Sequence, residues 1–164
     1  MSTPKVGILM GSISDRPVMQ ACADMLGSFD VPYEWRIMSA HRTPAVVEEF
    51  VSGAKERGIR VIICGAGMAA HLAGAAAAHT TLPIIGVPIG ATLDGMDALL
   101  ATVQMPPGLP VATVAIGRAG AKNAAILAVQ MLALSDERLA DALVEERRTM
   151  REKVAAADAE LQKG

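Results

Sequence analysis

The sequence predicts an α/β fold, a three-layer α/β/α sandwich around one parallel sheet. Short apolar segments alternate with longer segments in which apolar residues recur at helical spacing. Strand–helix–strand units of this kind pair their strands in parallel through right-handed crossovers. The chain has 164 residues, which suits one domain with a full core. We therefore expect residues 1–164 to form a single domain of the flavodoxin-like kind.

Five short apolar segments predict the strands of this sheet. The first, Val6–Met10, is apolar throughout and too short for a typical helix, which favours a strand buried on both faces. The other four also lie between segments of helical spacing. They are Tyr33–Met38, Val61–Cys64, Leu82–Pro88 and Val111–Ile116.

Capping residues mark where the first two helices begin. A helix is expected over 15–29, with Ser14 or Asp15 as its cap and Pro17 in the first turn. A second is expected to begin after Thr43, its N-cap, and to end near Gly58. Further helices are expected over about 69–79, 95–103 and 119–134, and a long amphipathic helix with a frayed tail over about 135–164.

Charge and cysteine content exclude several classes of function. The formal net charge is −2 and no basic block is present, so we expect no nucleic-acid partner. No apolar run reaches the roughly 18 residues of a membrane span, so we expect no membrane partner. Cys22 and Cys64 lack CxxC partners, which favours buried free thiols over a disulfide or metal site. Without a recognisable signal peptide, these features indicate a cytoplasmic protein.

Charge is distributed unevenly along the chain. Between Val61 and Gly117 the only Asp, Glu, Lys or Arg residues are Asp94 and Asp97, whereas residues 135–164 contain eight acids and six bases. A stretch with so little charge is unusual for a solvated surface, and large apolar surfaces mark interaction sites. We expect neighbouring copies of the chain to cover part of this region. The alternative is a large intramolecular core alone.

Three polar segments follow predicted strands. They are Gly11–Asp15, Ser39–Pro44 and Gly65–His71. Because parallel strands place such segments along one edge of the sheet, where open α/β sheets bind ligands, we expect them to converge. Together they supply glycines, hydroxyls, an acid, an arginine and two histidines, which suit a phosphorylated substrate and a proton transfer.

The first segment combines glycine flexibility with hydroxyl donors. Gly11 lets backbone N–H groups turn toward a ligand, and the start of the following helix favours an anion. Ser12 and Ser14 add hydroxyl groups, while Asp15 can accept hydrogen bonds from ribose hydroxyls. The alternative is a turn that only caps the helix.

The second segment carries His41 beside Arg42, just before the capped helix. Arginine grips phosphate or carboxylate with a planar fork of donors, and histidine exchanges a proton near neutral pH. The alternative is an exposed histidine beside an exposed arginine with no chemical role.

The third segment matches the G-x-G-x-x-[G/A] dinucleotide fingerprint over Gly65–Ala70. The match lies in the third strand–helix unit, and no acid follows the next strand, so we expect no NAD. A tight turn that brings His71 to the shared edge is the better interpretation. His79 has no obvious partner and is expected to be structural. The chain lacks a GxSxG elbow, a Walker A loop, an HExxH helix and a metal-ligand cluster.

Together these segments resemble the 5-(carboxyamino)imidazole ribonucleotide mutases of bacterial purine synthesis. The resemblance extends from Val6 to about Leu134. It rests on MGSISD (10–15), SAHRTP (39–44), GAGMAAHLAG (65–74), LPIIGVPIG (82–90), DALLATVQMPPGLPVATVAIG (97–117) and AGAKNAAILAVQML (119–132).

The resemblance implies an α/β/α homo-octamer and a cofactor-free reaction. A carboxyl group moves from the exocyclic nitrogen of an aminoimidazole ribonucleotide to a ring carbon. The resemblance makes His41 the general acid and base. It also implies that three residues bind the ribonucleotide, namely Ser12, Asp15 and Arg42. Further pocket residues would be Ser14, Ser39, Gly67, Ala70, His71 and Leu72.

Two residues depart from the pattern of many family members. Met68 replaces a glycine and adds bulk near the expected pocket, and Ala73 replaces a proline and relaxes a backbone constraint.

Two other functions compete with the mutase. One is a related carboxylase that uses free carbon dioxide. His71 in its Ala-His-Leu context favours the mutase over this carboxylase. The other is a non-catalytic nucleotide-binding module, which leaves His41 and Arg42 unexplained. Transient contact with the carbamate-forming synthetase is a further expectation.

Overall fold

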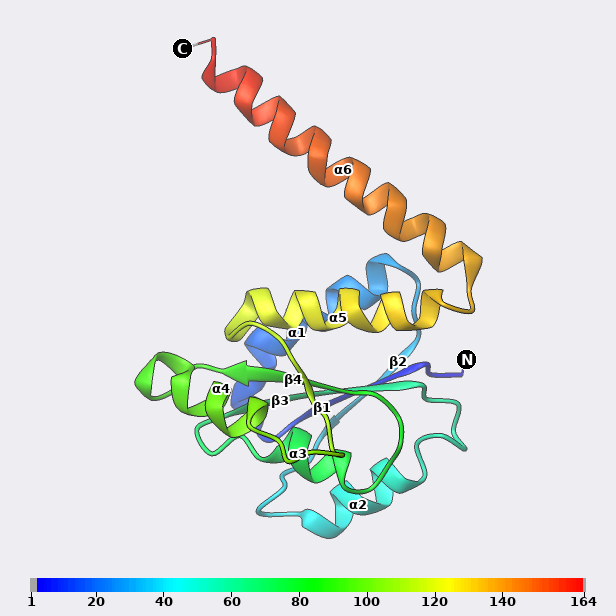
Figure 1. Cartoon of the computed structure of the whole chain (residues 1–164), viewed down its shortest axis with the longest axis vertical. Helices are drawn as coiled ribbons and strands as arrows, with labels where there is room; N and C mark the ends of the chain where they lie inside the picture. The colour runs from blue at the N-terminus through cyan, green and yellow to red at the C-terminus, as the bar shows by residue number, and fades with distance from the viewer. Residues whose placement is uncertain (1–2, 164) are drawn as a thin grey trace.

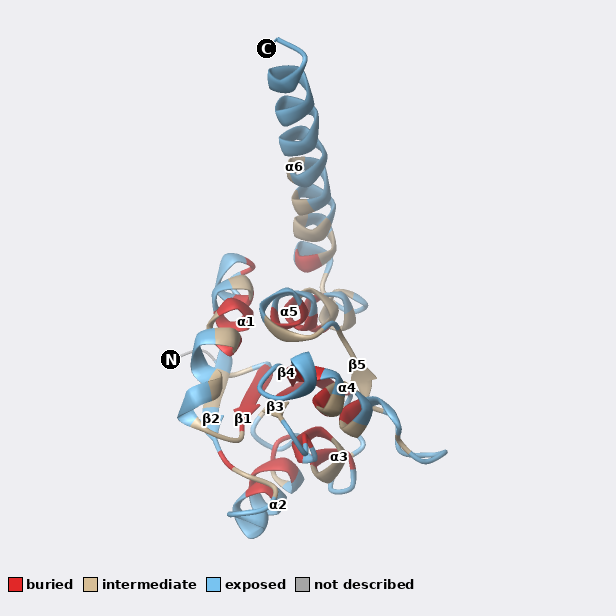
Figure 2. Ribbon diagram, turned by 90° about the vertical axis from the view of Figure 1, so that its left-hand side faces the viewer, coloured by how far each residue is buried: buried red, intermediate tan, exposed pale blue. Residues whose placement is uncertain are grey.

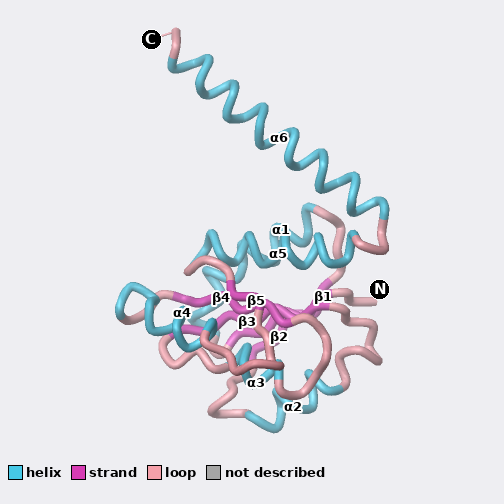
Figure 3. The backbone as a smooth tube through the Cα atoms, viewed as in Figure 1, coloured by secondary structure: helices cyan, strands magenta, loops and turns pink. Residues whose placement is uncertain are grey.

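The computed structural model describes residues 3–163, which form one parallel sheet between layers of helices (Figures 1 and 3). The strand order within these residues is β2–β1–β3–β4–β5, and every neighbouring pair is parallel. This is the flavodoxin-like order, so the predicted fold class is confirmed. The strands are β1 (Val6–Met10), β2 (Tyr33–Ile37), β3 (Val61–Gly67), β4 (Ile84–Ile89) and β5 (Ala112–Thr113).

Helices cover both faces of the sheet. α1 and α5 pack side by side on one face, α2 and α3 lie on the other, and α4 packs against β4 near the β5 edge (Figures 1 and 2). The α-helices are α1 (Arg16–Ser28), α2 (Pro44–Ser52), α3 (Leu72–Ala77), α4 (Met96–Val103), α5 (Gly117–Ala133) and α6 (Glu137–Leu161). Two short 3-10 turns are η1 (Ile13–Asp15) and η2 (Leu93–Gly95).

Two apolar cores hold these layers together. Along β1, Val6 and Ile8 belong to the core under α1 and α5, whereas Leu9 belongs to the core under α2 and α3. This alternation follows from the two-residue repeat of a strand. Cys22 lies in the first core and Cys64 in the second, and both are buried free thiols, as their apolar neighbours predict.

The fifth strand is shorter than the predicted Val111–Ile116. Only Ala112 and Thr113 pair with β4, and the N–H of Val114 still donates to the carbonyl of Gly86. The chain then turns into α5 through Gly117, whose φ of 76° lies in the left-handed region that favours glycine. The apolar run 111–116 therefore extends past the end of the strand, because its later residues supply the turn into α5.

Two helices are also shorter than predicted. α2 ends at Ser52 and not near Gly58, because residues 53–58 form a series of turns that ends at Gly58 with a φ of 93°. α3 spans only Leu72–Ala77, because β3 continues to Gly67 and residues 68–71 form the connection. Lys55, Arg57 and Gly58 therefore belong to the turns that follow α2 and not to the end of the helix itself.

The predicted C-terminal helix is present as α6. Leu139 is its buried residue, and beyond its first turns the helix projects away from the sheet (Figures 1 and 2). Its side chains include exposed Val144, Met150 and Val154. No helix within residues 3–163 has both the length and the apolar character needed to cross a membrane.

Candidate functional site

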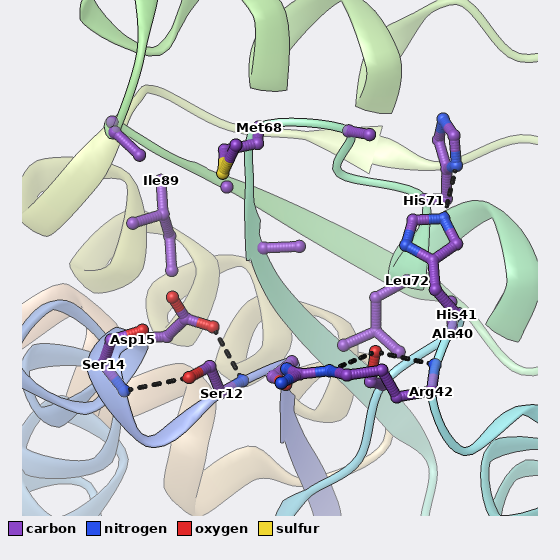
Figure 4. A pocket seen from close by; sticks show the side chains of 17 residues that line it. Ser12, Ser14, Asp15, Ala40, His41, Arg42, Met68, His71, Leu72 and Ile89 are labelled. Carbon is purple, nitrogen blue, oxygen red and sulfur yellow. Dashed lines mark hydrogen bonds between the residues drawn. The ribbon is translucent and has the colours of Figure 1, made fainter.

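A pocket of about 520 Å³ opens at the carboxyl ends of β1, β2, β3 and β4. It lies where β1 and β3 are neighbours and the strand order reverses, which is the usual ligand position in this class of sheet. The three polar segments converge there as expected, and Figure 4 shows their side chains around one hollow. The predicted residues that line it are Ser12, Ser14, Asp15, Ser39, His41, Arg42, Gly67, His71 and Leu72.

The segment after β1 forms a capped turn that also faces the pocket. The N–H of Ser12 donates to Asp15 Oδ2 at 3.0 Å, and the N–H of Ser14 donates to Ser12 Oγ at 3.3 Å. This is a capping box around η1. Burial raises the pKa of Asp15, while hydrogen bonds from Ser12 and Gly11 and the Arg42 charge oppose that rise. The turn therefore caps η1, and its residues Ser12, Ser14 and Asp15 also line the pocket.

Arg42 joins the segment after β2 to the segment after β1. Its Nη2 donates to the carbonyl of Gly11 at 2.6 Å, and its backbone N–H donates to Ser39 Oγ at 3.2 Å. The guanidinium is thus held at the pocket wall with further donors available. Thr43 occupies the predicted N-cap position of α2, but its Oγ1 accepts the N–H of Ser39 at 2.9 Å and does not bond to the helix.

The two pocket histidines contact each other. His41 Nε2 lies 2.8 Å from His71 Nδ1, and the rings meet edge to face with an interplanar angle of 84° (Figure 4). Both residues are exposed at the mouth of the pocket. The segments after β2 and β3 therefore bring two imidazoles into contact at the mouth of the pocket. His79, predicted to be structural, is exposed and does not line this pocket.

The segment after β3 departs from the expectations in one place. Ala70 is buried and lies outside the pocket lining, because the turn at residues 68–71 directs it toward the core. Met68 has a φ of 55°, a left-handed conformation that strains a residue with a side chain, and its exposed side chain lines the pocket. A side chain on Gly67 would come within 3.0 Å of the Ile89 carbonyl oxygen.

The fourth wall of the pocket was not predicted from the sequence. Ile89, Gly90 and Ala91 line it after β4. They carry no polar side chain, so their position after a fourth parallel strand was the only available signal. The wall they form is apolar and uncharged.

The lining combines a guanidinium, a group that can bind an anion, with two imidazoles, groups that can exchange protons near neutral pH. Asp15, His41, Arg42 and His71 are the titratable residues among its described members. The cysteines are unsuited to nucleophilic chemistry there, because burial raises the pKa of Cys22 and of Cys64 to about 12. Among residues 3–163, no three His, Cys, Asp or Glu side chains are grouped to hold a metal ion.

Comparisons with known proteins agree on one family. A family model described as AIR carboxylase matches residues 5–153. A Vibrio parahaemolyticus protein named N5-carboxyaminoimidazole ribonucleotide mutase is 60% identical over 134 residues, covering 81% of this chain and 83% of the relative. A Bacillus subtilis protein of the same name is 53% identical over 159 residues, covering 96% and 98%. The crystal structure of Treponema denticola PurE matches with a TM-score of 0.86 and 30% identity, covering 96% and 98%.

Proposed function

This chain belongs to the AIR carboxylase family, and from that premise we propose that it converts N5-carboxyaminoimidazole ribonucleotide to 4-carboxy-5-aminoimidazole ribonucleotide in purine biosynthesis. Relatives that carry the mutase name are 53–60% identical to it over most of the chain. The observation that carries the residue roles is the convergence of His41, Arg42, Ser12 and Asp15 on one pocket. The reaction makes the enzyme an isomerase.

Binding of the ribonucleotide is assigned to the wall built from β1 and β2. Arg42 supplies the positive charge and free N–H donors for the phosphate, assisted by the hydroxyl of Ser12. Asp15 accepts hydrogen bonds from the ribose hydroxyls, which suits a carboxylate held by its own loop. The apolar wall at 89–91 leaves the imidazole ring in an uncharged environment.

His41 is assigned both proton transfers. In the first step the carbamate N–C bond breaks, its electron pair returns to nitrogen, and nitrogen takes a proton from the His41 imidazolium as carbon dioxide leaves. In the second step the ring carbon attacks carbon dioxide, a C–C bond forms, and the neutral imidazole removes the ring proton. One histidine therefore ends the cycle in the state in which it began.

Carbon dioxide must stay beside the ring between these steps. Holding both fragments in one site makes recapture effectively intramolecular. In the single chain the pocket is open, with exposed His41, Arg42 and His71 at its rim. We propose that the bound nucleotide and neighbouring copies in a homo-octamer complete the enclosure.

We also propose that the protein is cytoplasmic. Its two buried free thiols support this location, because cysteines stay reduced in the cytoplasm.

Two assays test the proposal. Purified enzyme should turn over the carbamate efficiently, and efficient turnover only of aminoimidazole ribonucleotide plus bicarbonate would favour the carboxylase that the family description names. His41→Asn should abolish turnover while nucleotide binding and assembly persist. Full activity in that variant would overturn the assigned mechanism, and nucleotide binding without turnover in the unsubstituted chain would favour a binding module.

A further inference from the structure

The contact between His41 and His71 restricts where protons sit on the two rings. Their Nε2 and Nδ1 atoms are 2.8 Å apart, which is a hydrogen-bond distance. Such a bond needs an N–H on one ring and a lone pair on the other. Either His41 donates to His71, or His71 donates to His41.

The proposed reaction selects between these two arrangements. As the acid, His41 carries a proton on both nitrogens, so its Nε2 can only donate, and His71 Nδ1 must accept. After His41 gives up a proton, the same bond persists only if the proton leaves from Nδ1. Figure 4 shows the second nitrogen of the His41 ring on the side that faces the pocket.

We propose that His71 is a positioning residue that accepts the Nε2–H of His41 and thereby makes His41 Nδ1 the nitrogen that exchanges protons with the substrate. This inference rests on the proposed function. It differs from a role in lining the pocket, because His71 acts through His41 and the proposal names the reacting atom.

The surroundings of the pair support this assignment. The other charged residues that line the pocket are engaged elsewhere: Asp15 accepts from Ser12, and Arg42 donates to Gly11. Among the described residues, His71 is thus the side chain that is hydrogen-bonded to the His41 ring. The His71 backbone is itself fixed, since its N–H donates to the carbonyl of Ala69 and its carbonyl accepts the N–H of Ala75.

Two substitutions at one position test the proposal. The amide oxygen of His71→Asn can occupy the place of Nδ1 and accept the same bond, whereas His71→Ala removes the acceptor. We expect His71→Ala to lower kcat by about 10- to 100-fold with little change in KM, a smaller loss than the roughly 10²–10⁴-fold contribution of a general acid–base. His71→Asn should recover most of that loss, and His79→Asn, at an exposed histidine outside the pocket, should match the unsubstituted enzyme.

A spectroscopic measurement makes the test independent of turnover. Nitrogen-15 NMR of the ligand-free full chain should show neutral His41 as the Nε2–H tautomer in the unsubstituted and His71→Asn proteins, and as a mixture in His71→Ala. A His41 ring protonated on Nδ1 in the unsubstituted protein would overturn the proposal. So would His71→Ala with an unchanged tautomer and kcat, or with a changed KM alone. The predicted tautomers without mutase turnover would contradict the proposed function and leave the histidine pair intact.

Discussion

Single residues in this pocket both hold the loops and face the ligand position. Asp15 accepts the N–H of Ser12, and Arg42 donates to the carbonyl of Gly11, so each connects to the loop after β1. Each also lines the pocket with a charged group. Substitutions here must therefore be chosen so that the loop contacts survive while the charge changes.

Asp15→Asn separates these two contributions. The amide oxygen can still accept the N–H of Ser12, but the charge available to ribose hydroxyls is lost. A hydrogen bond to a charged group contributes about 1.5–3 kcal/mol, so we expect KM to rise by about 10- to 100-fold. The melting temperature at neutral pH should not fall, because burial raises the pKa of Asp15 and its ionised form is unfavourable in the folded chain.

The sign of this effect follows from proton linkage. A raised folded-state pKa favours folding at acidic pH, and that contribution is lost as the pH rises through the folded-state value. Asp24→Asn, on the exposed face of α1, is the matched control and should leave KM unchanged. An unchanged KM for Asp15→Asn, or a marked fall in its melting temperature, would indicate a purely structural carboxylate.

The two buried thiols make stability sensitive to alkali. Burial raises the pKa of Cys22 and of Cys64 to about 12, whereas an unfolded cysteine titrates near 8.5. The stability that neutral thiols contribute is present at pH 7 and is lost as the pH rises above about 8.5. Urea unfolding at pH 7 and pH 10 should show a smaller fall in the Cys22→Ala, Cys64→Ala double variant. Equal falls in both proteins would contradict the linkage.

At the scale of elements, periodicity predicted which segments form strands and helices, while contacts decided where several of them end. Val6–Met10 could be assigned to its bounds because one apolar run coincides with one buried strand. Residues 111–116 could not, because the same apolar run supplies both an edge strand and the turn into α5. The wall at 89–91 had no polar residue to reveal it, and the burial of Ala70 depends on a turn whose course the sequence pattern does not specify.

Two glycines in helices provide a matched test of element packing. A Cβ on Gly120 would lie 1.6 Å from the carbonyl oxygen of Ala115, so α5 cannot keep its place if a side chain is added. We expect Gly120→Ala to lower the free energy of unfolding by about 1–3 kcal/mol or more. A Cβ on Gly27 in α1 would meet nothing within 4 Å, so Gly27→Ala should raise it by about 0.5–1 kcal/mol. Urea unfolding measures both, and equal effects would contradict the packing at the start of α5.

At the scale of the whole molecule, the charge-poor stretch leaves apolar side chains on the surface. Exposed members on η2 and α4 are Leu93, Met96, Leu100 and Val103. α6 carries a second exposed apolar set beyond Leu139. Surfaces of this kind mark contacts between proteins, which is the basis for the proposed oligomer.

Two charge substitutions distinguish these surfaces. Light scattering of the full chain should give a mass of several subunits, and Leu100→Asp should shift it toward the monomer because a buried, unpaired charge is unfavourable at an interface. Val144→Asp places the same charge on α6. Dissociation by Val144→Asp alone would assign the contact to α6, and a monomeric unsubstituted chain at micromolar concentration would end the inference about covered surfaces.

In the proposed mechanism, one pocket releases and recaptures the same carbon dioxide molecule while His41 carries the proton. The most direct measurement follows a substrate labelled with carbon-13 in its carbamate carboxyl, turned over in buffer that contains unlabelled bicarbonate. We expect the label to appear in the ring carboxyl of the product, because the released carbon dioxide is recaptured before it can exchange with the buffer. A product whose carboxyl group comes from the buffer would contradict it.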